Sequence, residues 1–308
     1  MSALPMDLLS HLPGQLPKEE CCRLFHGRGH CYPGFEGVTL DWLAPSLLLT
    51  QFSAMTEQQS AELQRQIAAW WSTVSEMPLS LVWQDRSRSP AQTVCLGASP
   101  PTPHWVLENG LAFELSLMQG QNHGLFLDME RGREWVRAHS AGKQVLNLFA
   151  YTCAFSVYAM AGGAREVVNL DMSRPALAQG KRNHQRNGFD RGVRYLGHDL
   201  FKTFGKLKKL APFDLIVVDP PSFQQGSFIA TKDYPRLLRR LPELLGPSGE
   251  ALLCLNAPEL SRAYLRDQVQ ACAPALEFVQ QLENSVNFPD ADPDRSLKVL
   301  HYRLSKPE

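Results

Sequence analysis

The residues with the clearest chemical potential stand where apolar runs end. Residues 215–218 are apolar and mostly β-branched without alternation, which is typical of a strand covered on both faces of a parallel sheet, and Asp219 follows them. Asp171 and Asp199 stand at the ends of two other runs, and Asn147 lies near the end of a fourth. Open α/β sheets bind ligands at the carboxyl ends of their strands, so we expect these four side chains to gather at one edge.

The residues after Asp219 indicate a flat ligand. Pro220 and Pro221 cannot continue a strand and they fix the backbone, so Asp219, Ser222 and Phe223 are expected to project into a rigid turn. An acidic and aromatic lip suits a planar base better than a sugar or a fatty chain. We therefore place Asp219, Pro220, Pro221 and Phe223 in a candidate catalytic site.

The turn over residues 147–156 lies where nucleotide-binding sheets bend around a cofactor. It contains no GxGxxG, and a dinucleotide needs those glycines so that its pyrophosphate can approach the helix. S-adenosylmethionine carries no phosphate, so Asn147, Thr152 and Ser156, with the backbone of residues 150–153, could still hold its amino-acid end. An ordinary strand-to-helix turn fits this stretch equally well.

Two further aspartates have the spacing of a nucleoside site. Asp171 lies about twenty residues past that turn, where an acidic residue meets ribose hydroxyls. Asp199 could bind an adenine amino group while Leu200 covers the ring. A strand-terminal aspartate is also a common helix cap, so each signal is weak alone, and only the ordered set carries the hypothesis.

The elements that must position these residues alternate regularly after residue 124. Strands are predicted over 144–149, 166–171, 193–197, 213–219 and 250–256, with helices over 154–161, 173–187 and about 201–210, 232–245 and 259–273. Strands over 277–284 and 298–304 would complete the sheet. Repeated strand–helix units predict an α/β fold with a doubly wound, Rossmann-like parallel sheet.

The first part of the chain has a different pattern. Strands are predicted over 38–42, 46–52, 79–83 and 105–117 and a helix over 56–75, which together indicate a small α+β domain. Scattered prolines and glycines over 1–20 suggest a loose lead-in. We therefore predict a lead-in (1–20), a small α+β domain for substrate recognition (21–120) and a catalytic domain (121–308).

Composition bounds the class of protein. Hydrophobic residues make up 44% and charged residues 20% of the 308 residues, as in soluble globular proteins, and we find no signal peptide or run of membrane-spanning length. Seven cysteines without a CxxC pair favour reduced thiols and a cytoplasmic location. His26, His30 and Cys31 lack further ligands at zinc-type spacing, so we predict no metal site.

Charge is distributed unevenly although the net charge is zero. Residues 1–120 hold 6 basic against 11 acidic residues, and residues 121–308 hold 25 against 20. The positive part contains Asp219. Two predicted helices there carry basic clusters, which suit a phosphate backbone or simply a solvated helical face. The clusters are Lys202, Lys206, Lys208 and Lys209, and Arg236, Arg239 and Arg240.

At this point a family resemblance becomes specific. Residues 146–152 (LNLFAYT), Asn183 with Asn187, residues 197–201 (GHDLF) and residues 219–223 (DPPSF) resemble the class I S-adenosylmethionine-dependent methyltransferases that modify large-subunit ribosomal RNA. Residues 124–128 (GLFLD) followed by Gly132-Arg133 are similar to the segment before the catalytic sheet of that family. The resemblance covers about residues 25–305 and implies S-adenosylmethionine as cofactor and RNA as partner.

Together the residues and the resemblance give a predicted cofactor site. It comprises Asp128, Arg133, Asn147, Phe149, Ala150, Tyr151, Thr152, Asp171, Met172, Asp199, Leu200 and Asp219.

The chain departs from the family pattern in three places. Cys153 stands where the family usually has glycine after threonine, which narrows the room for the methionine end of the cofactor. Glu130 stands where an arginine is common, with Arg131 beside it. The amino-terminal RNA-binding module of many relatives has no counterpart, so RNA would be bound by the α+β domain, the basic surface or a partner.

The residue after the fifth predicted strand distinguishes two kinds of methylation. Relatives that methylate cytosine C5 carry a cysteine nucleophile there, because C6 must be attacked covalently to activate C5. In this chain the position falls at Asn256, and Cys254 is predicted to be a buried thiol within the strand. Asn256 instead resembles relatives that methylate a guanine nitrogen, closer to the guanine-N7 type, by direct attack. Asp219 and Asn256 would then hold the base edge while Phe223 stacks on it.

The sequence therefore predicts an S-adenosylmethionine-dependent methyltransferase acting on a base of 23S ribosomal RNA, with a ring nitrogen of guanine favoured. Three alternatives stay open: a cytosine-C5 methyltransferase of ribosomal RNA, a methyltransferase of a protein or small molecule, and a non-catalytic RNA- or ribosome-binding protein. Cys153 and Glu130 motivate the last of these. The sequence does not predict the oligomeric state.

Overall fold

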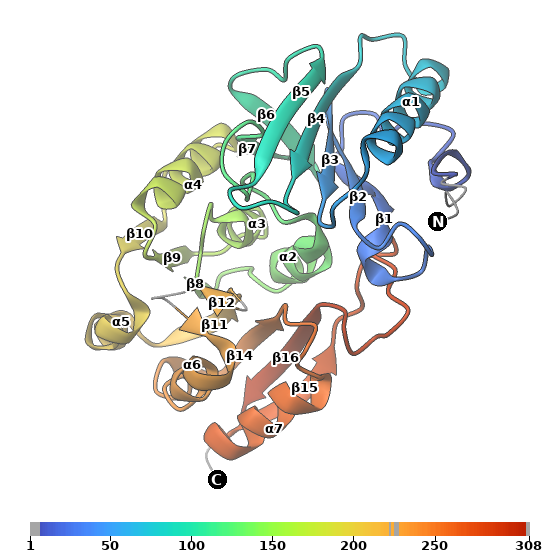
Figure 1. The fold of residues 1–308 in the computed structure, drawn as a ribbon. Coiled ribbons are helices and arrows are strands. Elements are labelled where there is room, and N and C mark those ends of the chain that lie inside the picture. The colour runs from blue at the N-terminus through green and yellow to red at the C-terminus, as the bar shows by residue number, and fades with distance from the viewer. Residues whose placement is uncertain (1–6, 222, 225–227, 306–308) are drawn as a thin grey trace. The chain divides into compact units, whose positions relative to one another are not determined.

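The computed structural model describes residues 7–221, 223–224 and 228–305, and the chain divides into two compact units (Figure 1). Unit 1 comprises Met1–Leu127 and Ser285–Ala291, and unit 2 comprises Asp128–Asn284 and Asp292–Glu308. None of the helices formed by the described residues has the length and apolar character needed to cross a membrane.

Unit 1 is built on a five-stranded sheet and one long helix. The sheet has the order β1-β2-β3-β4-β5, in which only the β3–β4 pair is parallel. A capping box between Thr56 and Gln59 starts α1 (Glu57–Val74), whose buried Leu63, Ile67 and Trp70 pack in the core of this unit. The strands are β1 (Cys22–His26), β2 (Val38–Leu43), β3 (Ser46–Gln51), β4 (Ser80–Asp85) and β5 (Gln92–Gly97).

Unit 1 differs from the sequence prediction in several ways. The strand predicted over 105–117 is a hairpin of β6 (His104–Glu108) and β7 (Leu111–Leu115), because Asn109 and Gly110 turn the chain at φ 50° and 74°. Strands β1 and β5 were not predicted. The described part of the predicted loose lead-in is packed, since Leu8 is fully buried and its N–H donates to the Gln66 side chain at 2.8 Å. The units also divide at residue 127 rather than 120.

The segment Ser285–Ala291 returns to unit 1 from late in the chain. The Ala291 N–H donates to the Gly29 carbonyl at 2.7 Å, and the Arg23 guanidinium lies 4.8 Å from the centre of the Phe288 ring. A Cβ on Gly29 would lie 1.7 Å from the Pro289 carbonyl oxygen, so only glycine permits this approach. Unit 1 is therefore complete only with residues from both ends of the chain.

Unit 2 contains a seven-stranded sheet of order β10-β9-β8-β11-β14-β16-β15. The strands are β8 (Gln144–Leu148), β9 (Glu166–Asp171), β10 (Val193–Gly197), β11 (Phe213–Val218), β14 (Leu245–Leu255), β15 (Leu276–Gln281) and β16 (Lys298–Leu304). The first five are mutually parallel, as predicted. However, β16 runs antiparallel between β14 and β15, because the long connection after β15 brings the chain back in the opposite direction. The sequence did not predict the antiparallel direction of this strand.

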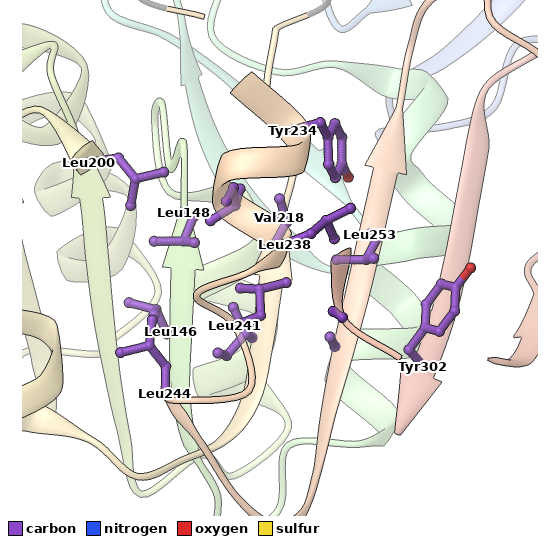
Figure 2. Packing of buried hydrophobic residues seen from close by; sticks show 14 of the residues in the cluster. Leu146, Leu148, Leu200, Val218, Tyr234, Leu238, Leu241, Leu244, Leu253 and Tyr302 are labelled. Atoms are coloured by element: carbon purple, nitrogen blue, oxygen red, sulfur yellow. The ribbon is translucent and has the colours of Figure 1, made fainter. Parts of the chain in front are cut away.

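Helices cover both faces of this sheet. On one face the core contains residues of α5 (Phe204–Leu210), α6 (Ala230–Leu238) and α7 (Arg262–Cys272), and Figure 2 shows Leu238, Leu241 and Leu244 beside strand residues such as Leu148. On the other face lie α2 (Glu130–Ala138) and α3 (Ala154–Ala161). Strand residues alternate between these faces, so the face of each side chain follows from its position. The second helix of the repeated units, α4 (Arg174–Arg186), follows β9.

A buried glutamate joins three strands at the amino-terminal side of the sheet. Glu250 in β14 is 6% exposed and accepts from His301 at 3.1 Å, from Arg303 at 3.2 Å and from Lys143. These bonds hold the Glu250 pKa well below its usual range, and the hydrogen bond from His301 has the largest effect. Because the folded-state pKa is lowered, Glu250 stabilises the fold above about pH 4.5 and this contribution is lost as the pH falls further.

We expect Glu250→Gln to lower the free energy of unfolding by about 2–4 kcal/mol at pH 7, because three polar partners lose a buried anion. The deficit should shrink below about pH 4.5, because Glu250 of the unfolded chain takes up a proton there while folded wild type keeps it ionised. Urea unfolding at pH 7 and pH 3.5 tests this, with the exposed Glu283→Gln as control, expected to change stability by under about 0.5 kcal/mol. An equal deficit at both pH values would contradict the prediction.

Candidate functional site

The predicted residues meet at the carboxyl edge of the unit 2 sheet. In the strand register Leu148 of β8 is paired with both Leu170 and Val218, so Phe149, Asp171 and Asp219 follow at one level. Asp171 is in turn opposite the last residue of β10, two positions before Asp199. The edge therefore carries three carboxylates from three strands, as the sequence predicted.

The loop between β8 and α3 has an unusual backbone held by polar contacts. Phe149, Tyr151 and Cys153 have φ of 56°, 46° and 63°, values that favour glycine. Asp171 accepts from the Tyr151 N–H at 2.8 Å through one oxygen and from the Ser173 N–H at 2.7 Å through the other. These bonds compensate for an unfavourable backbone and fix the shape of the loop.

Helix α4 holds the same loop from its far side. The Asn183 side chain is fully buried and donates to the Thr152 carbonyl at 3.0 Å. Asn183, one of the residues that carry the family resemblance, therefore stabilises the loop. A Cβ on Gly180 would lie 2.4 Å from the Cys153 Sγ and 3.0 Å from the Thr152 carbonyl oxygen. The Cys153 side chain is thus buried against α4, and the predicted narrowing of the cofactor site by Cys153 does not follow.

Asn147 does not lie where the prediction placed it. Its side chain is 1% exposed and donates to the Asn169 side chain at 2.9 Å, directly across the β8–β9 register. Asn169 donates to Ser156 at 3.0 Å, and Ser156 is 2.8 Å from the His184 Nε2. Because these polar groups satisfy one another inside the core, we remove Asn147 and Ser156 from the cofactor-contacting set.

The second and third strand ends provide a mixed surface. Asp171 is half-buried, and Met172 beside it is 52% exposed, an apolar side chain at a polar edge. Asp199 accepts from the Phe201 N–H at 2.8 Å and caps the short helix that follows. Leu200 is 6% exposed and belongs to the same core cluster as Leu148 (Figure 2), and its role over an adenine ring stays a prediction.

Asp219 lies in the most strongly perturbed part of this edge. It follows β11 on the face covered by α2, where the Arg133 side chain is 1% exposed. Burial, and then the negative charge of Asp128, raise the Asp219 pKa to about 7, although Arg133 opposes the shift. The structure thus brings Asp128, Arg133 and Asp219 together, and a carboxyl that titrates near neutrality in such a place is a mark of functional sites.

The departures near α2 have local explanations. Glu130 lies in the first turn of α2, where a carboxylate interacts favourably with the helix dipole. Arg131 forms a surface ion pair with Glu134 at 3.1 Å and is not directed into the cluster as a replacement.

Beyond Asp219 the chain forms a short hairpin. Pro220 is buried, and β12 (Phe223–Gln224) pairs with β13 (Phe228–Ile229). Ser222 and the Phe223 side chain, which we predicted to line the site, lie outside the part of the chain that the structure describes. Phe228 is buried and its ring centre lies 5.0 Å from that of Phe149, which joins this hairpin to the β8–α3 loop.

Asn256 follows β14 and is exposed at the same edge, two residues beyond the position opposite Asp219. Cys254 is fully buried within β14, as predicted, and burial raises its thiol pKa well above the usual value. The buried Lys298 donates from Nζ to the Ala257 carbonyl at 2.9 Å and so fixes the loop that carries Asn256. The Tyr234 hydroxyl donates to the Cys254 carbonyl at 3.0 Å.

Sequence reasoning missed three of these residues. Gly180 could have been noticed in the sequence, because an isolated glycine within a helix costs about 1 kcal/mol and usually marks a position where another group packs closely. Lys298 could also have been noticed, as a lone charge beside an apolar run. Tyr234 could not, because its contact with β14 depends on the packing of α6.

The donor and acceptor set of this edge fits S-adenosylmethionine. The cofactor offers an ammonium, two ribose hydroxyls, an adenine amino group and a positively charged sulfonium, and Asp171, Asp199 and Asp219 are acceptors with negative charge. Met172 supplies exposed apolar surface next to Asp171. Among the described residues no group of three or more His, Cys, Asp or Glu side chains is arranged to hold a metal ion.

Comparison with known proteins gives three findings. A family model for S-adenosylmethionine-dependent methyltransferases matches residues 22–303. Ribosomal RNA large subunit methyltransferase I of Pseudoalteromonas translucida is 32% identical over 268 residues (83% of this chain, 67% of the relative), and that of Aeromonas salmonicida is 31% identical over 226 residues (71% and 57%). The crystal structure of SMU.776 complexed with SAH has a TM-score of 0.84 at 25% identity and covers 93% of this chain and 76% of that one.

These findings confirm the predicted Rossmann-like fold with a smaller domain ahead of it. The chain spans only 57% and 67% of the length of the two curated relatives.

We expect Gly180→Ala to lower the free energy of unfolding by about 1–3 kcal/mol, because the new Cβ meets Cys153 and Thr152. Adding Cys153→Gly should restore most of the loss, since it removes Sγ and relieves the backbone at φ 63°. Thermal unfolding and titration with S-adenosylhomocysteine measure both effects. If the losses of unfolding free energy were additive in the double variant, the two residues would not be in steric conflict.

The Asp219 pKa gives a second prediction, for the cofactor-free protein. Because the folded-state pKa of about 7 exceeds the ordinary value of 3.8, the contribution of Asp219 to stability should be lost as the pH rises from about 4 to 7. Asp219 is only partly exposed, and Asp219→Asn removes a charge that its surroundings disfavour. We therefore expect the variant to be about 2 kcal/mol more stable than wild type at pH 8 and equal to it near pH 4. Urea unfolding at both pH values tests this, and a less stable variant at pH 8 would contradict it.

Proposed function

The chain belongs to the S-adenosylmethionine-dependent methyltransferases, and on that premise we propose that it methylates a base of large-subunit ribosomal RNA in the cytoplasm. Family membership confirms the predicted enzyme class and cofactor. The RNA substrate is inferred from relatives that are named ribosomal RNA large subunit methyltransferase I. Those relatives are longer than the matched region, so the substrate is a proposal for this chain.

One observation carries the substrate side of the proposal: a desolvated carboxyl with a pKa of about 7 at the end of β11, followed by two prolines. In its ionised form Asp219 can accept from the N–H donors of a base edge, and a site of low polarity strengthens such bonds. Pro220 is buried and restricts the backbone, so the carboxyl has a fixed position. Exposed Asn256 at the neighbouring strand end offers both a donor and an acceptor.

The thiols support direct transfer rather than covalent catalysis. Cytosine-C5 methylation needs an accessible thiolate, but Cys254 is fully buried with a raised pKa, and Cys153 is buried against α4. We therefore favour a ring nitrogen, whose lone pair can attack without a covalent enzyme intermediate, and guanine in particular. The names of the relatives do not specify a base, so the choice of guanine stays a prediction.

In the proposed mechanism the protein positions the base and excludes water. When bound, S-adenosylmethionine supplies an electrophilic methyl group on its sulfonium. Asp219 and Asn256 would orient the base edge so that the ring nitrogen points at that methyl carbon, which supplies most of the rate through alignment. Asp171 and Asp199 would hold the nucleoside part, with Arg133 balancing the nearby carboxylates.

The structure does not support the two observations that motivated the alternative of a non-catalytic protein. Cys153 is accommodated by Gly180, and Glu130 has a favourable place at the start of α2. Calorimetry tests whether this chain binds S-adenosylmethionine. Absence of binding at high micromolar cofactor would contradict a methyltransferase activity of this chain.

We expect Asp219→Ala to reduce methyl transfer at least about 100-fold, because the base loses its anchor. S-adenosylhomocysteine should still bind, since Asp171 and Asp199 remain to hold its nucleoside part. Cys254→Ala should retain activity within about threefold. The assay uses large-subunit ribosomal RNA from cells that lack this gene, with mass spectrometry of the methylated nucleoside. A methylated guanine is expected. Loss of activity in a folded Cys254→Ala protein, or a product of 5-methylcytidine, would establish the covalent mechanism instead.

A further inference from the structure

Two basic helices of unit 2 form one surface. The segment 202–210, which includes α5, carries Lys202, Lys206, Lys208 and Lys209. It lies beside α6 in the fold, since the Arg236 guanidinium is 4.0 Å from the centre of the Phe201 ring and Arg240 is 5.0 Å from that of Phe204. Both helices cover the same face of the sheet (Figure 1). Side chains that the sequence places on separate helices are thus neighbours.

The surface has an excess of positive charge. Residues 232–240 add Lys232, Arg236, Arg239 and Arg240 to the four lysines, which makes eight cations in the two segments. Apart from Asp214 in β11 and Asp219 after it, the acidic residues over 199–243 are Asp199, Asp233 and Glu243, which leaves five charges in excess. We call these two segments the α5–α6 basic surface.

Half of the cations are paired and half are not. Asp233 binds Arg236 at 2.8 Å, Asp199 lies 4.0 Å from Lys202, and Glu243 binds both Lys208 and Arg240. Within the described residues, Lys206, Lys209, Lys232 and Arg239 are exposed and form no ion pair. Four exposed cations remain available to anions from outside the chain.

The arginines are also ordered before any partner binds. Arg236 is held between the Phe201 ring and Asp233, and Arg240 between the Phe204 ring and Glu243. Fixed guanidinium groups lose little freedom when they bind a phosphate, so such a surface binds with a smaller entropic cost than flexible lysines alone.

We propose that the α5–α6 basic surface binds the phosphate backbone of the RNA substrate next to the base that enters the candidate site. The two segments begin close to that site in sequence, because Asp199 directly precedes the short helix before α5 and the hairpin after Asp219 leads into α6. The far ends of α5 and α6, which carry Lys209 and Arg239, lead to the starts of β11 and β14 at the opposite edge of the sheet. A strand of RNA along this surface would therefore run from that edge toward Asp219. The identity of the polymer rests on the proposed function, whereas its polyanionic character rests on the charge.

The test removes three unpaired cations together, as Lys206→Gln, Lys209→Gln and Arg239→Gln. Binding of a fluorescein-labelled, mixed-sequence 20-nucleotide RNA is measured by anisotropy between 50 and 300 mM KCl. We expect binding at 50 mM KCl to weaken about 10- to 100-fold and the slope of log K against log [KCl] to fall by about 2, at roughly 0.7 per lost phosphate contact. Binding of S-adenosylhomocysteine should not change.

A matched variant removes three exposed cations from other parts of unit 2: Lys181→Gln, Arg191→Gln and Arg295→Gln. We expect it to bind the RNA within about threefold of wild type. Equal losses in both triple variants, or no loss in the first, would overturn the proposal. It would also be overturned if polyglutamate of matched length bound this surface as tightly as the RNA, because the partner would then be an acidic polypeptide.

The experiments distinguish a failure of the proposed function from a failure of the proposed RNA-binding surface. If wild type methylates ribosomal RNA while the first triple variant binds RNA normally, the basic surface is wrong and the function stands. If the surface binds RNA as expected but wild type methylates none, the function is wrong and the surface stands.

Discussion

Desolvation of the Asp219 carboxyl group is the constraint on which the candidate site depends. A central strand covered on both faces leads to this residue, and the buried Arg133 and nearby Asp128 set the potential around it. Packing alone would favour an apolar side chain here, because an ionised carboxyl is costly to bury. Such a carboxyl, at the edge where parallel strands end, has the properties of an acceptor kept ready for a polar ligand.

Much of the catalytic fold could be predicted because each buried strand is a continuous apolar run. The ends of these runs located Asp171, Asp199 and Asp219 at one edge, and the buried position of Cys254 followed from the same run. Errors arose where the partner of a side chain lies in another element. Asn147 pairs with Asn169 across the strand register, which a single strand does not reveal.

Unit 1 was predicted less well for a related reason. Its sheet is mostly antiparallel, and strands such as β5 alternate or are partly exposed, so no continuous apolar run marks them. The Asn109-Gly110 turn was a readable signal for a hairpin, whereas the burial of Leu8 depends on Gln66 of a distant helix. Local turn chemistry can be read from the sequence, but contacts between distant segments cannot.

The return of Ser285–Ala291 to unit 1 constrains how the chain can fold during synthesis. The strands of unit 1 are translated before unit 2, but the segment that supplies Phe288 and approaches Gly29 is made only after almost the whole of unit 2. Unit 1 therefore cannot complete its fold until most of the larger unit has been synthesised. For the same reason a fragment that begins at Asp128 would contain this segment without the residues it packs against.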